Sequence, residues 1–261
     1  GAMYYERSRA LKRRLRAGET TFGAWVSFQD PGAAEIMAGT GYDWVFIDTE
    51  HSPFSLESLQ HVLMAFNGRA TVPIVRVPWN DRVRIKQVLD LGAEGILVPM
   101  VSSVRESQEA VAACKYPPEG NRGFGPRRAS DYYRDPEDYI QAANDGIIVV
   151  LQIEHEDGVR QVKEILDAPG IDVICLGPMD LSGSMGILGR LEHPRVVEAI
   201  ERVLAAAKDR ALPVCVPMET SLEAQIAWAR KGACFVVTGE DHGLLRRAAA
   251  DALNRYRAAL A

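Results

Sequence analysis

The sequence has few cysteines, no long apolar run and no excess of basic residues, and each shortage excludes a class of protein. Only 4 of its 261 residues are Cys, with no Cys-x-x-Cys pair, which argues against a disulfide scaffold and a structural zinc site. It contains no stretch of about 18 apolar residues, so no membrane-spanning helix and no membrane partner are expected. The net charge of −5 predicts no nucleic-acid partner.

The basic residues near the N-terminus cluster within residues 7–16. Leu11 and Leu15 lie one helical turn apart in this cluster, which predicts an exposed N-terminal helix; contact with nucleic acid or a membrane is the alternative. Residues 1–3 are interpreted as a remnant of cloning, and no signal peptide precedes the helix, so a cytoplasmic protein is expected.

Short apolar or β-branched runs alternate with segments of helical period from residue 21 to the C-terminus. Strands of this kind, each followed by a helix, predict a parallel sheet covered on its outer face, and eight such units favour a closed barrel. We therefore expect an α/β protein with a single (β/α)8 TIM barrel over residues 4–261 and an added N-terminal helix. The predicted strands are 21–26, 44–48, 74–77, 95–98, 147–153, 173–176, 214–216 and 235–238.

Polar side chains gather where these strands end, which is the catalytic face of such a barrel. Glu154 ends the fifth strand and Asp180 follows the sixth, so the two carboxylates can converge on one hard divalent cation and leave positions for water or substrate oxygens. The alternative is a solvated Glu and a helix-capping Asp.

His51 and Arg76 lie at the ends of the second and third strands. His51 is a candidate general base, although a lone histidine is usually an ordinary surface or core residue. Arg76 follows apolar strand residues, so it needs either structural carboxylates or an oxyanion that develops during a reaction. The remaining histidines have weaker cases, because none is expected to share a strand end with other acid–base groups; they are His61, His155, His193 and His242.

Lysine placement argues against a Schiff-base aldolase, which needs a desolvated lysine inside the barrel. Every lysine falls in a predicted helix or loop; they are Lys12, Lys86, Lys115, Lys163, Lys208 and Lys231. Enolate chemistry at this site would therefore depend on a metal ion.

Six segments carry a resemblance to a known family. They are Phe46-Ile47-Asp48-Thr49-Glu50-His51, Val75-Arg76-Val77-Pro78-Trp79-Asn80-Asp81, Leu97-Val98-Pro99-Met100-Val101, Tyr116-Pro117-Pro118-Glu119-Gly120 with Arg122-Gly123, Gln152-Ile153-Glu154 and Gly177-Pro178-Met179-Asp180-Leu181-Ser182. In this order they cover nearly the whole chain and resemble the HpcH/HpaI class II aldolases of the phosphoenolpyruvate/pyruvate barrel superfamily. The resemblance implies reversible cleavage of 4-hydroxy-2-oxoacids to pyruvate and an aldehyde.

The resemblance also implies roles for the residues at the strand ends. Glu154 and Asp180 are similar to the family's ligands for Mg²⁺, Mn²⁺ or Co²⁺. His51 resembles the acid–base residue, with Asp48 orienting it, and Arg76 resembles the residue that stabilises the pyruvate enolate.

A second group of residues is implied to bind substrate or complete the site. Gln152 is similar to a group near the metal-bound pyruvate. The turn at Gly177 and Pro178, with backbone N–H groups near Ser182, is expected to hold the substrate carboxylate at a helix N-terminus. Asp90 resembles a residue that reaches the His–Asp pair across a subunit boundary.

The family assembles as hexamers built from dimers, so the resemblance implies a homo-oligomer in which residues 244–260 pack on a neighbour. Met179 stands where the family usually has Ala, and the loop 123–130 is slightly shorter than its counterpart, so the aldehyde stays unassigned. Decarboxylation of oxaloacetate-like acids is the alternative reaction at the same site. A barrel that serves only as a binding module is the alternative from another class, although the site residues listed above are all present.

Overall fold

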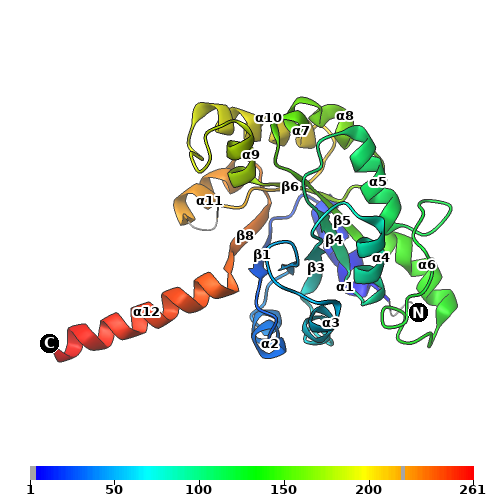
Figure 1. The fold of residues 1–261 in the computed structure, drawn as a ribbon, viewed down its shortest axis with the longest axis horizontal. Helices are drawn as coiled ribbons and strands as arrows, with labels where there is room; N and C mark the ends of the chain where they lie inside the picture. Colours follow the sequence, from blue (N-terminus) through cyan, green and yellow to red (C-terminus); the bar gives the residue numbers. More distant parts are fainter. Residues whose placement is uncertain (1–3, 219–220) are drawn as a thin grey trace.

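The computed structural model describes residues 4–218 and 221–261 and shows parallel strands surrounded by helices (Figure 1). The supposed cloning remnant at 1–3 lies outside the described residues. The strands pair in the order β7-β6-β5-β4-β3-β2-β1-β8, so the predicted TIM barrel is confirmed in a nearly closed form. The strands are β1 (Thr21–Val26), β2 (Trp44–Asp48), β3 (Val72–Arg76), β4 (Gly95–Val98), β5 (Ile148–Ile153), β6 (Val173–Leu176), β7 (Val214–Cys215) and β8 (Phe235–Glu240).

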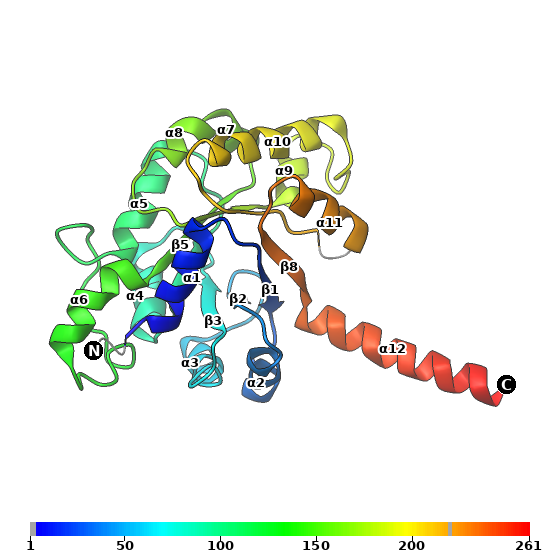
Figure 2. The same cartoon turned by 180° about the vertical axis from the view of Figure 1, so that it is seen from behind.

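Helices follow the strands, and all but α12 pack around the barrel; one more precedes β1 (Figures 1 and 2). They are α1 (Glu6–Arg16), α2 (Pro31–Gly39), α3 (Leu56–Met64), α4 (Arg82–Asp90), α5 (Val104–Cys114), α6 (Pro136–Gly146), α7 (Glu156–Arg160), α8 (Val162–Leu166), α9 (Pro178–Ser184), α10 (Pro194–Lys208), α11 (Leu222–Arg230) and α12 (Asp241–Leu260).

Two strands differ from their predicted ends in ways that affect the site. β3 begins at Val72 and includes Pro73, whose carbonyl still accepts a hydrogen bond from the backbone N–H of Glu94. β8 runs to Glu240 because a bulge in its pairing with β1 shifts the register between Gly23 and Trp25. The bulge brings Glu240 level with Trp25, at the carboxyl-end rim of the barrel.

The N-terminal helix α1 closes the amino end of the barrel, as the view from behind shows (Figure 2). Leu11 and Leu15 are buried in the same apolar cluster as the barrel interior. Lys12 is also buried, and its Nζ lies 3.3 Å from the Asp172 carboxylate. The helix was therefore predicted correctly in position but wrongly as exposed, because its two leucines cover the open end of the barrel and remove that apolar surface from water.

Aromatic side chains fill the interior below the mouth. The Trp44 ring stacks on Phe235 with centroids 3.7 Å apart and planes inclined by 9°, and its Nε1 donates a hydrogen bond to Thr21. A Cβ atom at Gly23 would lie 2.2 Å from the Trp44 ring, so only glycine fits there. The filled interior leaves the carboxyl-end rim as the place for chemistry.

The C-terminal helix α12 projects away from the barrel instead of packing on it (Figures 1 and 2). It leaves a groove of about 640 Å³ beside β8 and α11, whose walls include Phe22, Leu222, Ile226 and Val236. Within the described part of the chain, no helix is both long and apolar enough to cross a membrane.

Candidate active site

Asp48 and Arg76 form the central ion pair of the rim. They occupy matching positions in the β2–β3 register, and Arg76 donates two hydrogen bonds, from Nε to Oδ1 over 2.9 Å and from Nη2 to Oδ2 over 2.8 Å. The guanidinium also lies 4.4 Å from the Trp25 ring centroid. This two-point geometry fixes the plane of the guanidinium.

Burial acts against both charges, yet the pair keeps them. Burial alone would raise the pKa of Asp48, but the hydrogen bonds and charge of Arg76 outweigh it and hold that pKa below its ordinary value. Burial likewise would lower the pKa of Arg76, and Asp48 raises it instead. Arg76 therefore stays a cation at the mouth, as an oxyanion-stabilising group must.

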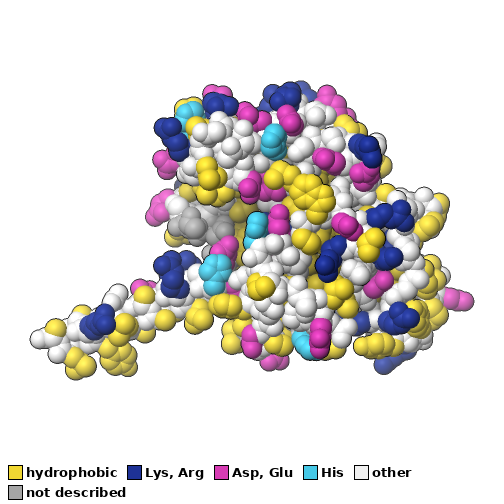
Figure 3. Space-filling model, viewed as in Figure 1, with side chains coloured by type: hydrophobic (Ala, Val, Ile, Leu, Met, Phe, Trp, Pro, Cys, Tyr) yellow, Lys and Arg dark blue, Asp and Glu magenta, His cyan; other side chains and the backbone are white. Residues whose placement is uncertain are grey.

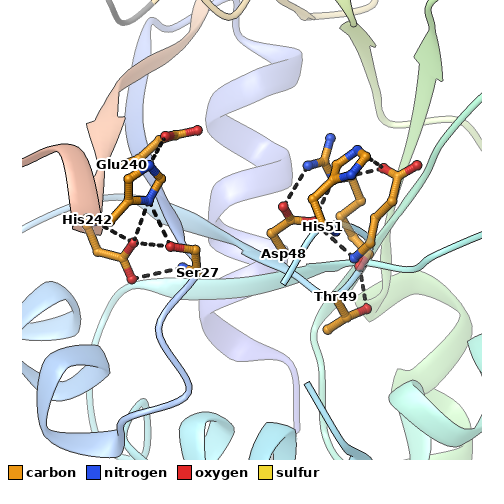
Figure 4. Close-up of polar contacts among 9 residues, drawn as sticks. Ser27, Asp48, Thr49, His51, Glu240 and His242 are labelled. Carbon is orange, nitrogen blue, oxygen red and sulfur yellow. Dashed lines mark hydrogen bonds and ion pairs between the residues drawn. The ribbon is translucent and has the colours of Figure 1, made fainter. Parts of the chain in front are cut away.

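The His51 ring contacts Glu50, and Asp48 contacts only the His51 backbone (Figure 4). His51 Nε2 lies 3.5 Å from Glu50 Oε2, whereas Asp48 Oδ1 accepts from the His51 backbone N–H at 3.3 Å. The expected orientation of the ring by Asp48 is therefore not the arrangement within this chain, because Arg76 occupies both Asp48 oxygens. The ring is 64% exposed, three residues beyond the end of β2.

Glu50 joins the histidine to the arginine. Its Oε2 lies 3.3 Å from Arg76 Nε and 3.5 Å from the His51 ring. Burial raises the pKa of Glu50, while Arg76 and His51 pull it down. Sequence reasoning gave Glu50 no role, although its place between Asp48 and His51 at a strand end was the available signal.

Glu154 is a buried carboxylate with a single backbone donor. Only 3% of the residue is exposed, and Oε1 accepts the Met100 backbone N–H over 2.8 Å. Met100 has a left-handed backbone, with φ 54°, which is uncommon for a non-glycine residue and directs its N–H at the Glu154 carboxylate. Burial raises the pKa of Glu154 to about 7, and the charges of Asp180 and Glu50 act in the same direction.

Gln152 and Asp180 complete this side of the mouth. Gln152 is 3% exposed, and its Oε1 is a buried atom without a hydrogen-bond partner. Asp180 lies in the first turn of α9 and is exposed to the mouth, close enough for its charge to raise the pKa of Glu154. Buried polar atoms are normally satisfied, so the Gln152 oxygen indicates a missing partner.

These oxygen donors fit a hard divalent cation. A cation would neutralise the mutual repulsion of Glu154 and Asp180 and offset the cost of burying Glu154. No cluster of three or more His, Cys, Asp or Glu side chains suited to a metal occurs among the described residues, so the protein would supply two carboxylates and leave the remaining positions to water or substrate.

Gly177 holds the Glu154 side chain in place by lacking one of its own. A Cβ atom at Gly177 would lie 2.2 Å from Glu154 Oε2 and 2.6 Å from Glu154 Cβ. Gly177→Ala is therefore expected to displace the carboxylate, lower kcat about 100-fold and reduce the free energy of unfolding by about 1–3 kcal/mol.

Steady-state kinetics and urea unfolding measure both effects of Gly177→Ala. Gly39→Ala is the matched control, because an added Cβ there meets its nearest atom at an ordinary 3.7 Å. Unchanged kcat in Gly177→Ala would show that Glu154 does not need this position.

Two residues predicted to contact the substrate, Ser182 and Pro178, are buried within the protein. The Ser182 hydroxyl is buried; it donates to the Met179 carbonyl over 2.6 Å and accepts from the Gly189 N–H over 2.9 Å. Pro178 is buried as the first residue of α9. The Ser182 side chain therefore fastens α9 to the loop after it, and only the backbone of this helix start remains available to a ligand.

Asp90 lies apart from the His51 side chain and pairs with the long loop before α6. Its Oδ1 accepts from Arg122 Nη2 over 2.8 Å, and the Arg122 side chain is fully buried against the Tyr116 ring. Within this chain Asp90 therefore pairs with Arg122 and not with His51 or Asp48. The expected contact across a subunit boundary would need a second copy of the chain.

A second group of acid–base residues also lies on this rim. Glu240 ends β8, and His242 is the second residue of α12, with His242 Nε2 2.9 Å from Glu240 Oε2 (Figure 4). The expectation that His242 shares no strand end with acidic groups is therefore wrong. In the space-filling view, histidine and acidic side chains gather around the depression at the centre of this face (Figure 3).

Comparison with known proteins gives consistent matches along the chain. A sequence model of the family described as HpcH/HpaI aldolase/citrate lyase matches residues 21–248. The chain is 40% identical over 255 residues to 4-hydroxy-2-oxo-heptane-1,7-dioate aldolase from Escherichia coli, with 95% of each chain covered.

Two solved structures are similar over nearly their whole length. An HpcH/HpaI aldolase/citrate lyase family protein from Burkholderia cenocepacia has a TM-score of 0.91 at 34% identity, covering 95% of this chain and 99% of that one. The HpcH/HpaI aldolase from Desulfitobacterium hafniense has a TM-score of 0.87 at 30% identity, covering 95% and 96%.

Proposed function

The chain belongs to the HpcH/HpaI aldolase/citrate lyase family, and we propose that it is a carbon–carbon lyase that reversibly cleaves 4-hydroxy-2-oxoacids to pyruvate and an aldehyde. The observation that carries the proposal is the rim itself: a buried carboxylate, Glu154, faces Asp180 on one side, and Arg76 and His51 follow on neighbouring strand ends. The name of the Escherichia coli relative supports aldol cleavage over decarboxylation.

We infer that the enzyme uses a divalent metal ion, as the family generally does, with Mg²⁺, Mn²⁺ or Co²⁺ as the candidates. Glu154 and Asp180 would hold it, and the Gln152 oxygen would face the pyruvate beside it. When bound, such an ion supplies Lewis-acid stabilisation of the developing enolate charge. Arg76 would add a fixed positive charge that stabilises the same enolate. The hydrogen bonds to Asp48 hold the guanidinium in its orientation.

His51 would move the proton. In the cleavage direction its ring, directly or through one water, accepts the proton of the C4 hydroxyl while the C3–C4 bond breaks. The aldehyde leaves, and protonation at C3 completes pyruvate. Glu50 stabilises the protonated ring, since its carboxylate lies 3.5 Å from Nε2.

Removal of metal tests this proposal directly. Chelation with EDTA is expected to abolish pyruvate release from a 4-hydroxy-2-oxoacid, and Mg²⁺, Mn²⁺ or Co²⁺ is expected to restore it. A lactate dehydrogenase couple measures the pyruvate. Activity that survives chelation, or inactivation by borohydride in the presence of pyruvate, would contradict the proposal, because borohydride traps a Schiff base that this site has no lysine to form.

We further propose a homo-oligomer, a hexamer that is a trimer of dimers, in which α12 packs into the groove of a neighbouring copy. The helix exposes Leu245, Leu253, Tyr256 and Leu260, and the groove beside β8 is apolar. In this arrangement Asp90 would reach Asp48 and His51 of the next subunit. Sedimentation velocity is expected to show a hexamer for the full chain and smaller species for Leu253→Arg. Ala258→Arg, on the opposite face of α12, is the matched charge control; equal masses for Leu253→Arg and wild type would contradict the packing of Leu253.

A further inference from the structure

A second polar cluster lies beside the proposed catalytic site and takes no part in the reaction described above (Figure 4). It comprises Ser27, which follows β1, with Glu240, Asp241 and His242 at the β8–α12 junction. His242 Nε2 lies 2.9 Å from Glu240 Oε2, and His242 Nδ1 lies 3.0 Å from Ser27 Oγ. Ser27 Oγ also donates a hydrogen bond to Asp241 Oδ1 over 2.5 Å.

The cluster carries a net negative charge. Glu240 and Asp241 supply two carboxylates, and both lie close to the single imidazole ring of His242. The ring carries at most one positive charge, and the Ser27 hydroxyl is neutral. The carboxylates therefore outnumber the cations in this cluster.

Asp241 is the buried anchor of the cluster, and Glu240 and His242 form its open face. Asp241 has only 4% of its side chain exposed, and its Oδ2 accepts the backbone N–H groups of Ser27 and Phe28. In contrast, 38% of the Glu240 side chain and 52% of the His242 side chain are exposed. Among the residues that the structure describes, none donates a hydrogen bond to Glu240 Oε1, so this oxygen is an open acceptor.

The strand registers place this open face on the same rim as the reacting groups. Trp25 is level with Glu240, and Val26 is level with Ile47, which directly precedes Asp48. One strand, β1, separates β8 from β2, so two interstrand spacings of about 4.8 Å put Glu240 roughly 10 Å from Asp48 along the rim.

The barrel order also sets the direction in which a substrate would extend. β5, which Glu154 directly follows, and β1 are four strands apart in the eight-stranded order and so lie opposite each other across the mouth. The groups that act on the C3–C4 bond lie between them, on β2 and β3. A substrate with its pyruvate part at Glu154 therefore directs its distal carbons toward β1 and β8.

We propose that Glu240 and His242 form the subsite for the distal end of the aldehyde fragment, and that this subsite selects hydroxyl groups over carboxylates. The proposal rests on the proposed aldol function and deepens it. Glu240 Oε1 accepts from a substrate hydroxyl, while the net negative charge of the cluster opposes a distal carboxylate. The anchored Asp241 keeps both side chains at the rim.

Retro-aldol kinetics with two substrates test the subsite. One is a 3-deoxy-2-oxohexonate, whose distal carbons carry hydroxyls, and the other is 4-hydroxy-2-oxoheptanedioate, whose distal end is a carboxylate. Full-length, metal-loaded wild type is expected to favour the hydroxylated substrate at least about tenfold in kcat/KM. Glu240→Gln is expected to reduce that ratio about tenfold, because it removes the charge and keeps the shape.

A control variant and a folding measurement distinguish failure of the subsite from failure of the aldol function. Glu198→Gln removes the same charge from an exposed position on α10, and is expected to leave the ratio at the wild-type value. Circular dichroism establishes that each variant is folded. If wild type cleaves both substrates and Glu240→Gln keeps the wild-type ratio, or if wild type prefers the dioate, the subsite is wrong and the aldol function stands. If metal-loaded wild type cleaves neither substrate, both the subsite and the aldol function are wrong.

Discussion

Glu154→Gln is expected to lower kcat for retro-aldol cleavage by about 10³-fold or more and, at the same time, to stabilise the metal-free protein. Glutamine keeps the size of the side chain and the acceptor for the Met100 N–H, and it loses the charge that a cation needs. The loss of activity would therefore come from the site and not from the fold.

The stability gain has a defined sign and pH range. Burial raises the pKa of Glu154 from 4.5 to about 7, so ionising it costs the folded state more than the unfolded chain. This free-energy cost increases as the pH rises from 4.5 to about 7 and reaches its full value at higher pH. At pH 8 in EDTA, Glu154→Gln is expected to raise the free energy of unfolding by about 1–3 kcal/mol.

Urea unfolding and coupled kinetics on the same samples measure both effects of Glu154→Gln. Glu198→Gln on the exposed face of α10 is the matched control and is expected to change neither quantity. A variant that keeps more than a tenth of wild-type kcat would show that Glu154 does not hold the metal.

His51→Ala is expected to reduce kcat/KM for aldol cleavage by about 10²–10⁴-fold, the usual contribution of a positioned general base. The ring is 64% exposed, so its removal leaves the core intact. Oxaloacetate decarboxylation has no C4 hydroxyl to deprotonate, so the same variant is expected to keep that activity if the site catalyses it.

The two activities of His51→Ala are compared by pyruvate release from each substrate. His61→Ala, an exposed histidine on α3, is the matched control. If decarboxylation and aldol cleavage fall together, His51 acts on a step that the two reactions share and its assignment to the C4 hydroxyl is wrong.

The barrel was predictable because its strands are buried on both faces and read as short apolar runs separated by helical periods. The position of the candidate site could be predicted from the strands, because the carboxyl ends of parallel strands lie at the same end of the barrel. Four strands have the predicted bounds, β3 differs by one or two residues at both ends, and the other three differ by one or two residues at one end. The missed bulge had the largest consequence, because it carries Glu240 to the rim.

Pairing between side chains was harder to predict than their placement. Asp48 and His51 are close in sequence, but Asp48 faces Arg76 across the β2–β3 register, and a two-point ion pair with that guanidinium takes up its oxygens. The burial of α1 was missed for a related reason. Two leucines one turn apart form only a narrow apolar stripe, which is also found on exposed helices. Its burial depends on the open end of the barrel, which the sequence of the helix alone does not reveal.

Glu154 and Asp180 are proposed to hold a divalent cation where pyruvate binds. Crystals of the protein soaked with Mn²⁺ and pyruvate, measured at the manganese absorption edge, test this metal site. We expect one strong anomalous peak at the barrel mouth, bonded to oxygens of Glu154, Asp180 and pyruvate at roughly 2.0–2.3 Å. A mouth without a peak, or a peak that touches neither carboxylate, would contradict it.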